Sequence, residues 1–163
     1  MKYVKYSAIV TLLLLVGFFL PANSSSELEA MLEEPEKELA AYMTELQVLT
    51  HKLGLSIDAE NSQLVQFYLH ESLVKVEEIQ MTLPEYEGVP VALLMERMAL
   101  PAYQSVREQY DNKASKDYYA DLSVAYKGLL NNCNACHASS GREYLRISHN
   151  TTNPYLQDFT PAN

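Results

Sequence analysis

Two cysteines and one histidine stand close together near the end of the chain, as Cys133, Cys136 and His137 in the run Cys-Asn-Ala-Cys-His. On a helix, residues three or four positions apart share a face, so both thiols and the imidazole would lie on one side. Thiols at this spacing can add to the two vinyl groups of one porphyrin, and the adjacent imidazole can bind its iron. The run therefore predicts one covalent haem c, attached through Cys133 and Cys136 and ligated by His137.

Two other kinds of site use cysteine pairs at this spacing. A thioredoxin-like redox disulfide follows a strand in a βαβ unit, but no strand pattern lies near Cys133. A tetrahedral zinc site would need two further ligands, and the sequence has neither a second cysteine pair nor a histidine pair at zinc-binding spacing. Haem attachment is therefore the interpretation that the sequence favours.

Helical periodicity extends over most of the chain and predicts the elements that position this run. Apolar residues recur at spacings of three and four in four segments, residues 35–57, 58–82, 91–110 and 115–139. Pro101 lies inside the third segment and predicts a kink or two short helices there. Gly141 stops the fourth helix, and the polar residues 142–163 show no period. We expect an all-α protein, an up-down-up-down four-helix bundle within residues 25–141, followed by an irregular C-terminal tail.

The apolar stripe of the fourth segment leads directly to the two cysteines. Its members are Tyr118, Leu122, Ala125, Leu129, Cys133 and Cys136. The first segment carries Leu39, Met43, Leu46, Thr50, Leu53 and Ile57 at similar spacing, and the second carries Val65, Leu69, Val76, Ile79 and Leu83. Stripes of this kind face inward in a bundle. The thiols would therefore hold a haem that the other helices cover, which adds apolar burial to folding.

The beginning of the chain predicts a secretory signal over residues 1–24. Lys2 and Lys5 precede an apolar stretch at residues 6–20, and small residues follow Pro21. At about 1.5 Å per residue this stretch makes roughly 22 Å of helix, short of a hydrocarbon core of about 30 Å. A cleaved signal is therefore favoured over an uncleaved membrane anchor. It predicts export to the periplasm, with no stable membrane anchor after cleavage.

Composition limits the partners of the chain. Its 163 residues are 48% hydrophobic, which is enough for one buried core. The 12 basic residues against 21 acidic ones give a formal charge of −9, and this charge argues against nucleic acid as a partner. An acidic run begins the first predicted helix, formed by Glu33, Glu34, Glu36 and Glu38. It suits a helix N-terminus, and its alternative role is to dock a redox partner with a basic surface.

The placement of the C-x-x-C-H run at residues 133–137, on the last of four predicted helices, resembles the class II c-type cytochromes. These are the cytochrome c′ group and its low-spin relatives, and the resemblance covers residues 35–139. It implies a four-helix bundle with one haem c and, because such bundles often pair through helix faces, a homodimer. Family members often carry a basic residue about one turn after the haem histidine, which makes Arg142 or Arg146 the candidate partner of a propionate. Pro101 and the long tail depart from the family pattern.

The residue on the other side of the iron decides the function. Met43 is the candidate sixth ligand, because it lies on the inward stripe and the first and last helices of such a bundle are antiparallel. The resemblance implies the same, since six-coordinate relatives take a methionine from their first helix. A methionine on an apolar stripe otherwise fills the core. Met31 is the weaker alternative as a sixth ligand. Among the histidines, His51 and His70 lie off the apolar stripes of their helices and are expected at the surface, and His149 lies in the tail.

A methionine sixth ligand gives low-spin iron suited to electron transfer. We therefore expect a periplasmic monohaem c-type cytochrome that exchanges electrons with a redox partner protein and is not an enzyme. The alternative is a five-coordinate haem protein of the cytochrome c′ kind, which would bind nitric oxide or carbon monoxide. A peroxidase would need a distal histidine and arginine pair, for which the sequence offers no suitable positions.

Overall fold

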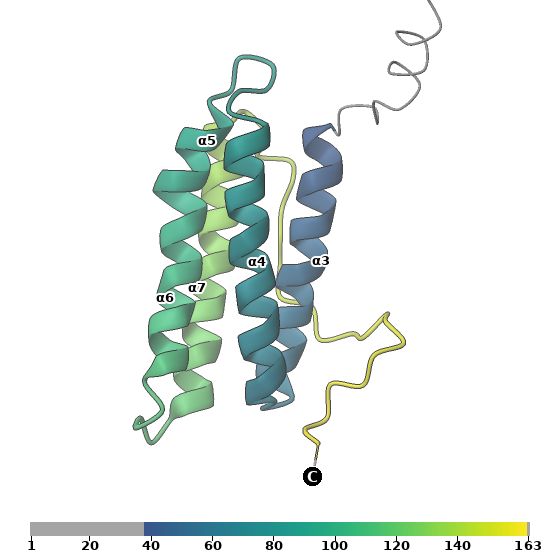
Figure 1. Ribbon diagram of the computed structural model, residues 1–163, viewed down its shortest axis with the longest axis vertical. Helices are drawn as coiled ribbons and strands as arrows, with labels where there is room; N and C mark the ends of the chain where they lie inside the picture. Colours follow the sequence, from purple (N-terminus) through teal and green to yellow (C-terminus); the bar gives the residue numbers. More distant parts are fainter. Residues whose placement is uncertain (1–37, 163) are drawn as a thin grey trace, which may run out of the picture. The chain divides into compact units, whose positions relative to one another are not determined.

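The computed structural model describes residues 38–162, which fold into four helices with no strand among them (Figure 1). α3 spans Leu39–Asp58, α4 spans Ser62–Thr82 and α7 spans Tyr118–Ser139. The third helix consists of three consecutive segments, α5 (Val91–Leu94), η1 (Met95–Ala99) and α6 (Leu100–Asp111). α3 packs against α4, α4 against α6, α6 against α7, and α7 against α3. The prediction of an all-α protein is confirmed.

Several predictions concern residues outside the described part of the chain. The secretory signal at residues 1–24, Met31 and most of the acidic run lie there. Residue 35, where the first helix was predicted to start, also lies outside the described residues. α3 itself starts at Leu39, because Glu38 has an extended backbone and forms the N-cap. Within residues 38–162, no helix is long and apolar enough to cross a membrane.

A tight turn joins α3 to α4. The pattern predicted a second helix that starts at Asp58, but α3 extends to Asp58 and α4 begins at Ser62. Asn61 sets this start, because its side chain accepts a hydrogen bond of 3.1 Å from the backbone N–H of Leu64. The bond satisfies one of the free donors in the first turn of the helix.

Pro101 lies within a continuous helix. A proline has no N–H, and in a regular α-helix its ring meets the carbonyl four residues earlier. Here the preceding residues Met95–Ala99 form a π-helical turn, in which the N–H of Leu100 donates to the carbonyl of Met95. The wider turn accommodates the proline ring at the start of α6. Of the two predicted alternatives, a break into separate short helices does not occur.

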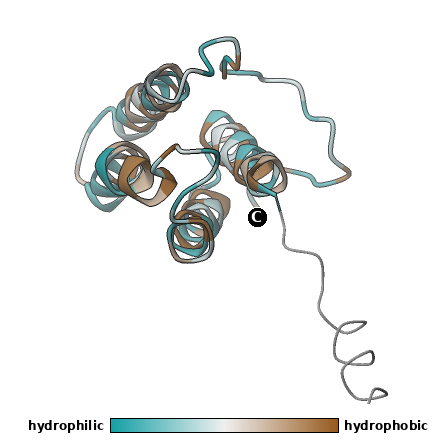
Figure 2. Ribbon diagram, turned by 90° about the horizontal axis from the view of Figure 1, so that it is seen from above, coloured by the Kyte–Doolittle hydropathy of each residue, from teal (hydrophilic) through white to brown (hydrophobic). Residues whose placement is uncertain are grey.

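The core lies between the helices and is lined by the predicted stripes. The four stripe residues within α4 and Leu83 at its C-cap are all buried. So are Leu46, Thr50, Leu53 and Ile57 of α3 and Leu122 and Leu129 of α7. Residues nearer the ends of the stripes, Leu39, Met43 and Cys133, are partly buried against the same core. Figure 2, seen along the helices, shows that each helix carries both hydrophobic and hydrophilic residues. Burial therefore follows the spacing of the apolar residues.

α3 and α7 approach each other closely at Gly54. A Cβ atom built on Gly54 would lie 2.5 Å from both Cζ and the hydroxyl oxygen of Tyr126. The Tyr126 hydroxyl donates to the backbone carbonyl of Thr50 at 3.1 Å, which holds the ring against α3. The absence of a side chain at Gly54 therefore lets the Tyr126 ring rest on the backbone of α3.

The C-terminal tail contains no helix or strand over residues 142–162, yet it is attached to the helices. Figure 1 shows the tail, in yellow, passing beside α3. Near its end Phe159 is buried beside Tyr68, and Asn61 donates to the carbonyl of Phe159 at 3.0 Å. Tyr68 also donates to the side chain of Gln157. The tail and the helices therefore form one compact unit.

Candidate haem-attachment site

The last two turns of α7 carry the C-x-x-C-H run. Cys133, Cys136 and His137 are all half-buried, and the two thiols are free. The helix is continuous to Ser139, so the spacing of three and four residues places the three side chains on one side. The structure thus brings together the residues that the sequence predicted to act jointly.

Both thiols are neutral at physiological pH. Burial, with a smaller contribution from Cys136, raises the pKa of the Cys133 thiol from its ordinary value of 9.0 to about 11. Burial also raises the pKa of Cys136. Cys133 packs against the hydrophobic core. Each side chain therefore keeps the S–H hydrogen that an addition to a vinyl group requires.

The imidazole of His137 is held by a hydrogen bond to the tail. Its Nδ1 lies 2.8 Å from the backbone carbonyl oxygen of Leu145. Because a carbonyl can only accept, Nδ1 carries the proton and donates it. In the neutral ring the lone pair is then on Nε2, where it can bind a metal ion. Metal-binding histidines commonly use their second nitrogen in this way, so His137 has the tautomer that an iron ligand needs.

A compact turn after α7 brings Leu145 back to His137. The N–H of Arg142 donates to the carbonyl of His137 at 2.8 Å, and the N–H of Leu145 donates to the carbonyl of Arg142 at 2.9 Å. Gly141 adopts a left-handed φ of 71°, which a residue with a side chain rarely does. The guanidinium of Arg142 pairs with Glu87 at 2.8 Å. Arg142, one of the two candidate propionate partners, is therefore paired with a carboxylate of the protein.

No family model, curated protein or solved structure matches this chain. The interpretation of the site therefore rests on its own residues. In the part of the chain that the structure describes, no three His, Cys, Asp or Glu side chains gather into a group that could hold a metal ion. A haem iron takes four ligands from its porphyrin and needs only one or two from the protein. Two free thiols and an imidazole with its lone pair on Nε2 fit that requirement.

A buried polar cluster that the sequence did not single out lies near Cys133. The hydroxyl of the fully buried Tyr103 lies 2.5 Å from Thr50 Oγ1, which itself donates to the carbonyl of Leu46 at 2.6 Å. Tyr103 is therefore the donor to Thr50. Burial raises the pKa of Tyr103 and of Tyr126, and the nearby Cys133 raises both further. Both phenols therefore stay protonated near Cys133. In the sequence, the only indication of this polar cluster was Thr50, a polar residue on an apolar stripe.

A pocket of about 380 Å³ lies between α3, α7 and the tail. Its walls include Thr44 on α3, Leu130 on α7 and Arg146 in the tail. Leu130 precedes Cys133 by about one helical turn, and Cys133, Cys136 and His137 themselves do not line the pocket. Its volume is within the range of small-ligand sites. Arg146, the other candidate propionate partner, lines this pocket.

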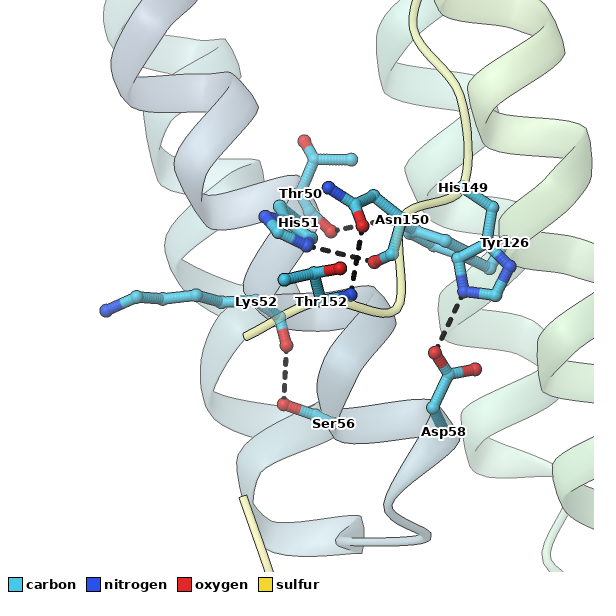
Figure 3. Close-up of polar contacts among 9 residues, drawn as sticks. All are labelled: Thr50, His51, Lys52, Ser56, Asp58, Tyr126, His149, Asn150 and Thr152. Atoms are coloured by element: carbon cyan, nitrogen blue, oxygen red, sulfur yellow. Dashed lines mark hydrogen bonds and ion pairs between the residues drawn. The ribbon is translucent and has the colours of Figure 1, made fainter. Parts of the chain in front are cut away.

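Two histidines fasten the tail to the helices (Figure 3). On α3, His51 bonds through Nε2 to the carbonyl of Asn150 at 2.9 Å and through Nδ1 to the hydroxyl of Tyr155 at 3.1 Å. His149 lies 2.9 Å from a carboxylate oxygen of Asp58. His51 was expected at the surface, and the tail covers part of its side chain, which is half-buried. Both nitrogens of His51 are engaged by the tail, so it is not a spare iron ligand.

Met43, the predicted sixth ligand, is half-buried on α3 and packs against the hydrophobic core. α3 contacts α7, the helix that carries the motif. A second methionine, Met95, is buried in the π-helical turn, which also contacts α7. His70 is exposed on α4, as expected. The position of Met43 suits both core filling and ligation, so its role as a ligand stays a prediction.

Proposed function

We propose that this protein is an exported monohaem c-type cytochrome that transfers electrons. The observation that carries the proposal is the hydrogen bond from His137 Nδ1 to the carbonyl of Leu145, because it leaves the Nε2 lone pair available to a metal ion on a residue that directly follows a free cysteine. The four-helix body supports the finer proposal of an up-down-up-down bundle like that of the class II c-type cytochromes. Cleavage after residue 24 and delivery to the periplasm belong to the same proposal.

Three side chains would hold the cofactor. Cys133 and Cys136 each form one thioether by adding the S–H group across a vinyl double bond, with sulfur on one carbon and hydrogen on the other. His137 would bind iron through the Nε2 lone pair, while Nδ1 keeps its proton and donates it in a hydrogen bond to the carbonyl of Leu145. When bound, haem supplies a one-electron iron couple. The packed helices keep the three side chains half-buried, so they are partly shielded from water.

Met43 completes the proposal as the sixth ligand. Its thioether sulfur is a soft ligand that favours ferrous, low-spin iron. The side chain is half-buried on α3, which contacts α7, and these are the two helices that such a ligand pair requires. With the sulfur bound, the iron offers no open position to a small gas. If Met43 does not bind, the five-coordinate alternative with nitric oxide or carbon monoxide as ligand takes the place of electron transfer.

The surface suggests what the cytochrome would meet. A net charge of −9 favours a redox partner with a basic docking surface. Phe67, Val74 and Met81 are exposed at spacings of seven residues on α4, with 52%, 45% and 78% of their surface accessible. This apolar stripe supports the proposal that two copies pair through a helix face.

Expression in an exporting host with the c-type maturation machinery tests the proposal. The mature protein should gain the mass of one haem, keep its colour during acid extraction into organic solvent, and show a low-spin absorption spectrum. The double variant Cys133→Ala/Cys136→Ala is the matched control and should carry no covalent haem. A mature mass equal to that of the bare chain would contradict attachment. A high-spin spectrum that responds to carbon monoxide would replace electron transfer with gas binding.

A further inference from the structure

Asn134, the first variable residue of the C-x-x-C-H run, makes two hydrogen bonds to one residue of the tail. Its Nδ2 donates to the backbone carbonyl of Ile147 at 2.9 Å, and its Oδ1 accepts from the backbone N–H of Ile147 at 2.7 Å. Both bonds are partly buried, where water competes less for the same groups. The side chain of Ile147 also packs against the core. Asn134 therefore fastens the tail to α7 at one point.

This point lies close to the acceptor of the His137 proton. Ile147 follows Leu145 by two residues, and two residues span at most about 7 Å of chain. Fixing Ile147 therefore restricts where the carbonyl of Leu145 can lie. On its other side, the N–H of Leu145 donates to the carbonyl of Arg142 at 2.9 Å. The acceptor of His137 is thus held from both sides, by Asn134 and by the turn after α7.

We propose that Asn134 is a positioning residue for the iron ligand, because it places the Leu145 carbonyl that fixes the tautomer and ring orientation of His137. The inference rests on the proposed function, since its consequence is measured at the iron. A carbonyl acceptor on Nδ1 makes the imidazole a stronger electron donor through Nε2. A stronger donor stabilises ferric iron over ferrous iron. Loss of the Asn134 bonds therefore raises the reduction potential.

Asn134→Ala tests this role, and Asn132→Ala is its matched control. Asn132 lies two residues earlier on α7, is exposed, and bonds within its own helix to the carbonyl of Gly128 at 3.0 Å. In the mature ferrous protein, NMR measures how fast the His137 Nδ1 proton exchanges with water. Asn134→Ala should speed this exchange about tenfold, the factor that corresponds to the loss of one hydrogen bond, and should raise the reduction potential. Asn132→Ala should change neither.

Asn134→Asp is a second variant that keeps the experiment decisive if the alanine variant does not mature. It retains an acceptor for the N–H of Ile147 and loses the donor to the Ile147 carbonyl, so the Nδ1 proton should exchange faster than in the wild type, by less than in Asn134→Ala. Its carboxylate charge also stabilises ferric iron, so proton exchange alone is the readout for this variant. Unchanged exchange and potential in the folded variants would overturn the proposal. A loss of stability with neither quantity altered would overturn it as well, because that result indicates a structural role only.

The proposed function and this positioning role can fail separately. If the wild-type protein carries no haem, the proposed function fails, and the ¹⁵N shifts of His137 in the wild type and in Asn134→Ala still show whether Asn134 keeps the proton on Nδ1. Identical shifts would then overturn the positioning role too. If the wild type carries haem and Asn134→Ala behaves like Asn132→Ala, the positioning role alone fails.

Discussion

Replacing Gly54 by alanine should destabilise the protein, although this change stabilises most helices. Gly54 lies in the interior of α3, where a glycine costs about 1 kcal/mol relative to alanine. The new Cβ would lie 2.5 Å from Cζ and the hydroxyl oxygen of Tyr126, far inside a normal contact distance. The ring is rigid, and its hydroxyl is bound to the carbonyl of Thr50. It can move away only by losing that bond.

The two effects of the Gly54→Ala change have opposite signs, and the steric effect is the larger. Overpacking in a core typically costs about 1–3 kcal/mol. Loss of the hydrogen bond from Tyr126 to Thr50 adds about 1 kcal/mol. The gain in helix propensity offsets about 1 kcal/mol of this. The free energy of unfolding should therefore fall by about 1–3 kcal/mol.

Gly128→Ala is the matched control, because Gly128 lies inside α7 and a Cβ built there meets nothing within 4 Å. It should raise the free energy of unfolding by about 0.5–1 kcal/mol. Urea unfolding of the mature protein, followed by circular dichroism, measures both changes. In the double variant Gly54→Ala/Tyr126→Leu, most of the penalty of the Gly54 change should disappear. A Gly54→Ala variant as stable as Gly128→Ala would refute the close approach of α3 and α7.

Four further predictions concern individual residues. His137→Ala should leave both thioether positions in place and alter the absorption spectrum; an unaltered spectrum would point to another proximal ligand. Met43→Ala should convert low-spin iron to high-spin iron and lower the reduction potential in a redox titration. If Met43 only fills the core, the spectrum should persist and urea unfolding should show a loss of about 1–2 kcal/mol, below the range for a fully buried methionine because Met43 is half-buried. Thr50→Val should lower the free energy of unfolding by about 1–3 kcal/mol in the same assay, because the buried hydroxyl of Tyr103 loses its acceptor. Before haem attachment, Cys133 should react with iodoacetamide at pH 8 roughly a hundredfold more slowly than in the urea-unfolded chain, because burial raises its pKa from 9.0 to about 11. That rate should rise as the pH approaches 11, and equal rates at pH 8 would contradict the burial of the thiol.

The buried faces of the helices were predictable, whereas the helix ends were not. Burial follows from the spacing of apolar side chains, so the stripe of α4 was found in full. A helix end depends on single residues that compete for the cap. Ser115 was in the predicted start of the fourth helix, but α7 begins at Tyr118 with Asp117 as its N-cap. Ser115 instead donates to the side chain of Asp121 and accepts from the N–H of Asp117.

The side chains of the candidate site were predictable, and their backbone partners were not. The C-x-x-C-H run shows its chemistry through residue type and spacing. The acceptor for His137 is the main-chain carbonyl of Leu145, and because every residue has a carbonyl, no residue type marks it. The same reason hid the contact between His51 and the carbonyl of Asn150. A polar composition predicts that the tail lacks regular structure and says nothing of where it binds.

The π-helical turn at Met95–Ala99 determines how the third helix can change in evolution. Met95 and Tyr103 are both buried, and Tyr103 follows Met95 by eight residues. In a regular α-helix, two side chains at this spacing point in directions about 80° apart around the helix axis. The turn takes up one residue, so the two side chains return to the same face. A related chain that lacks one residue in this turn could therefore keep the same core. It would have to replace Pro101 as well, because the proline ring would then meet a regular helical turn. The deletion and the loss of the proline should thus occur together.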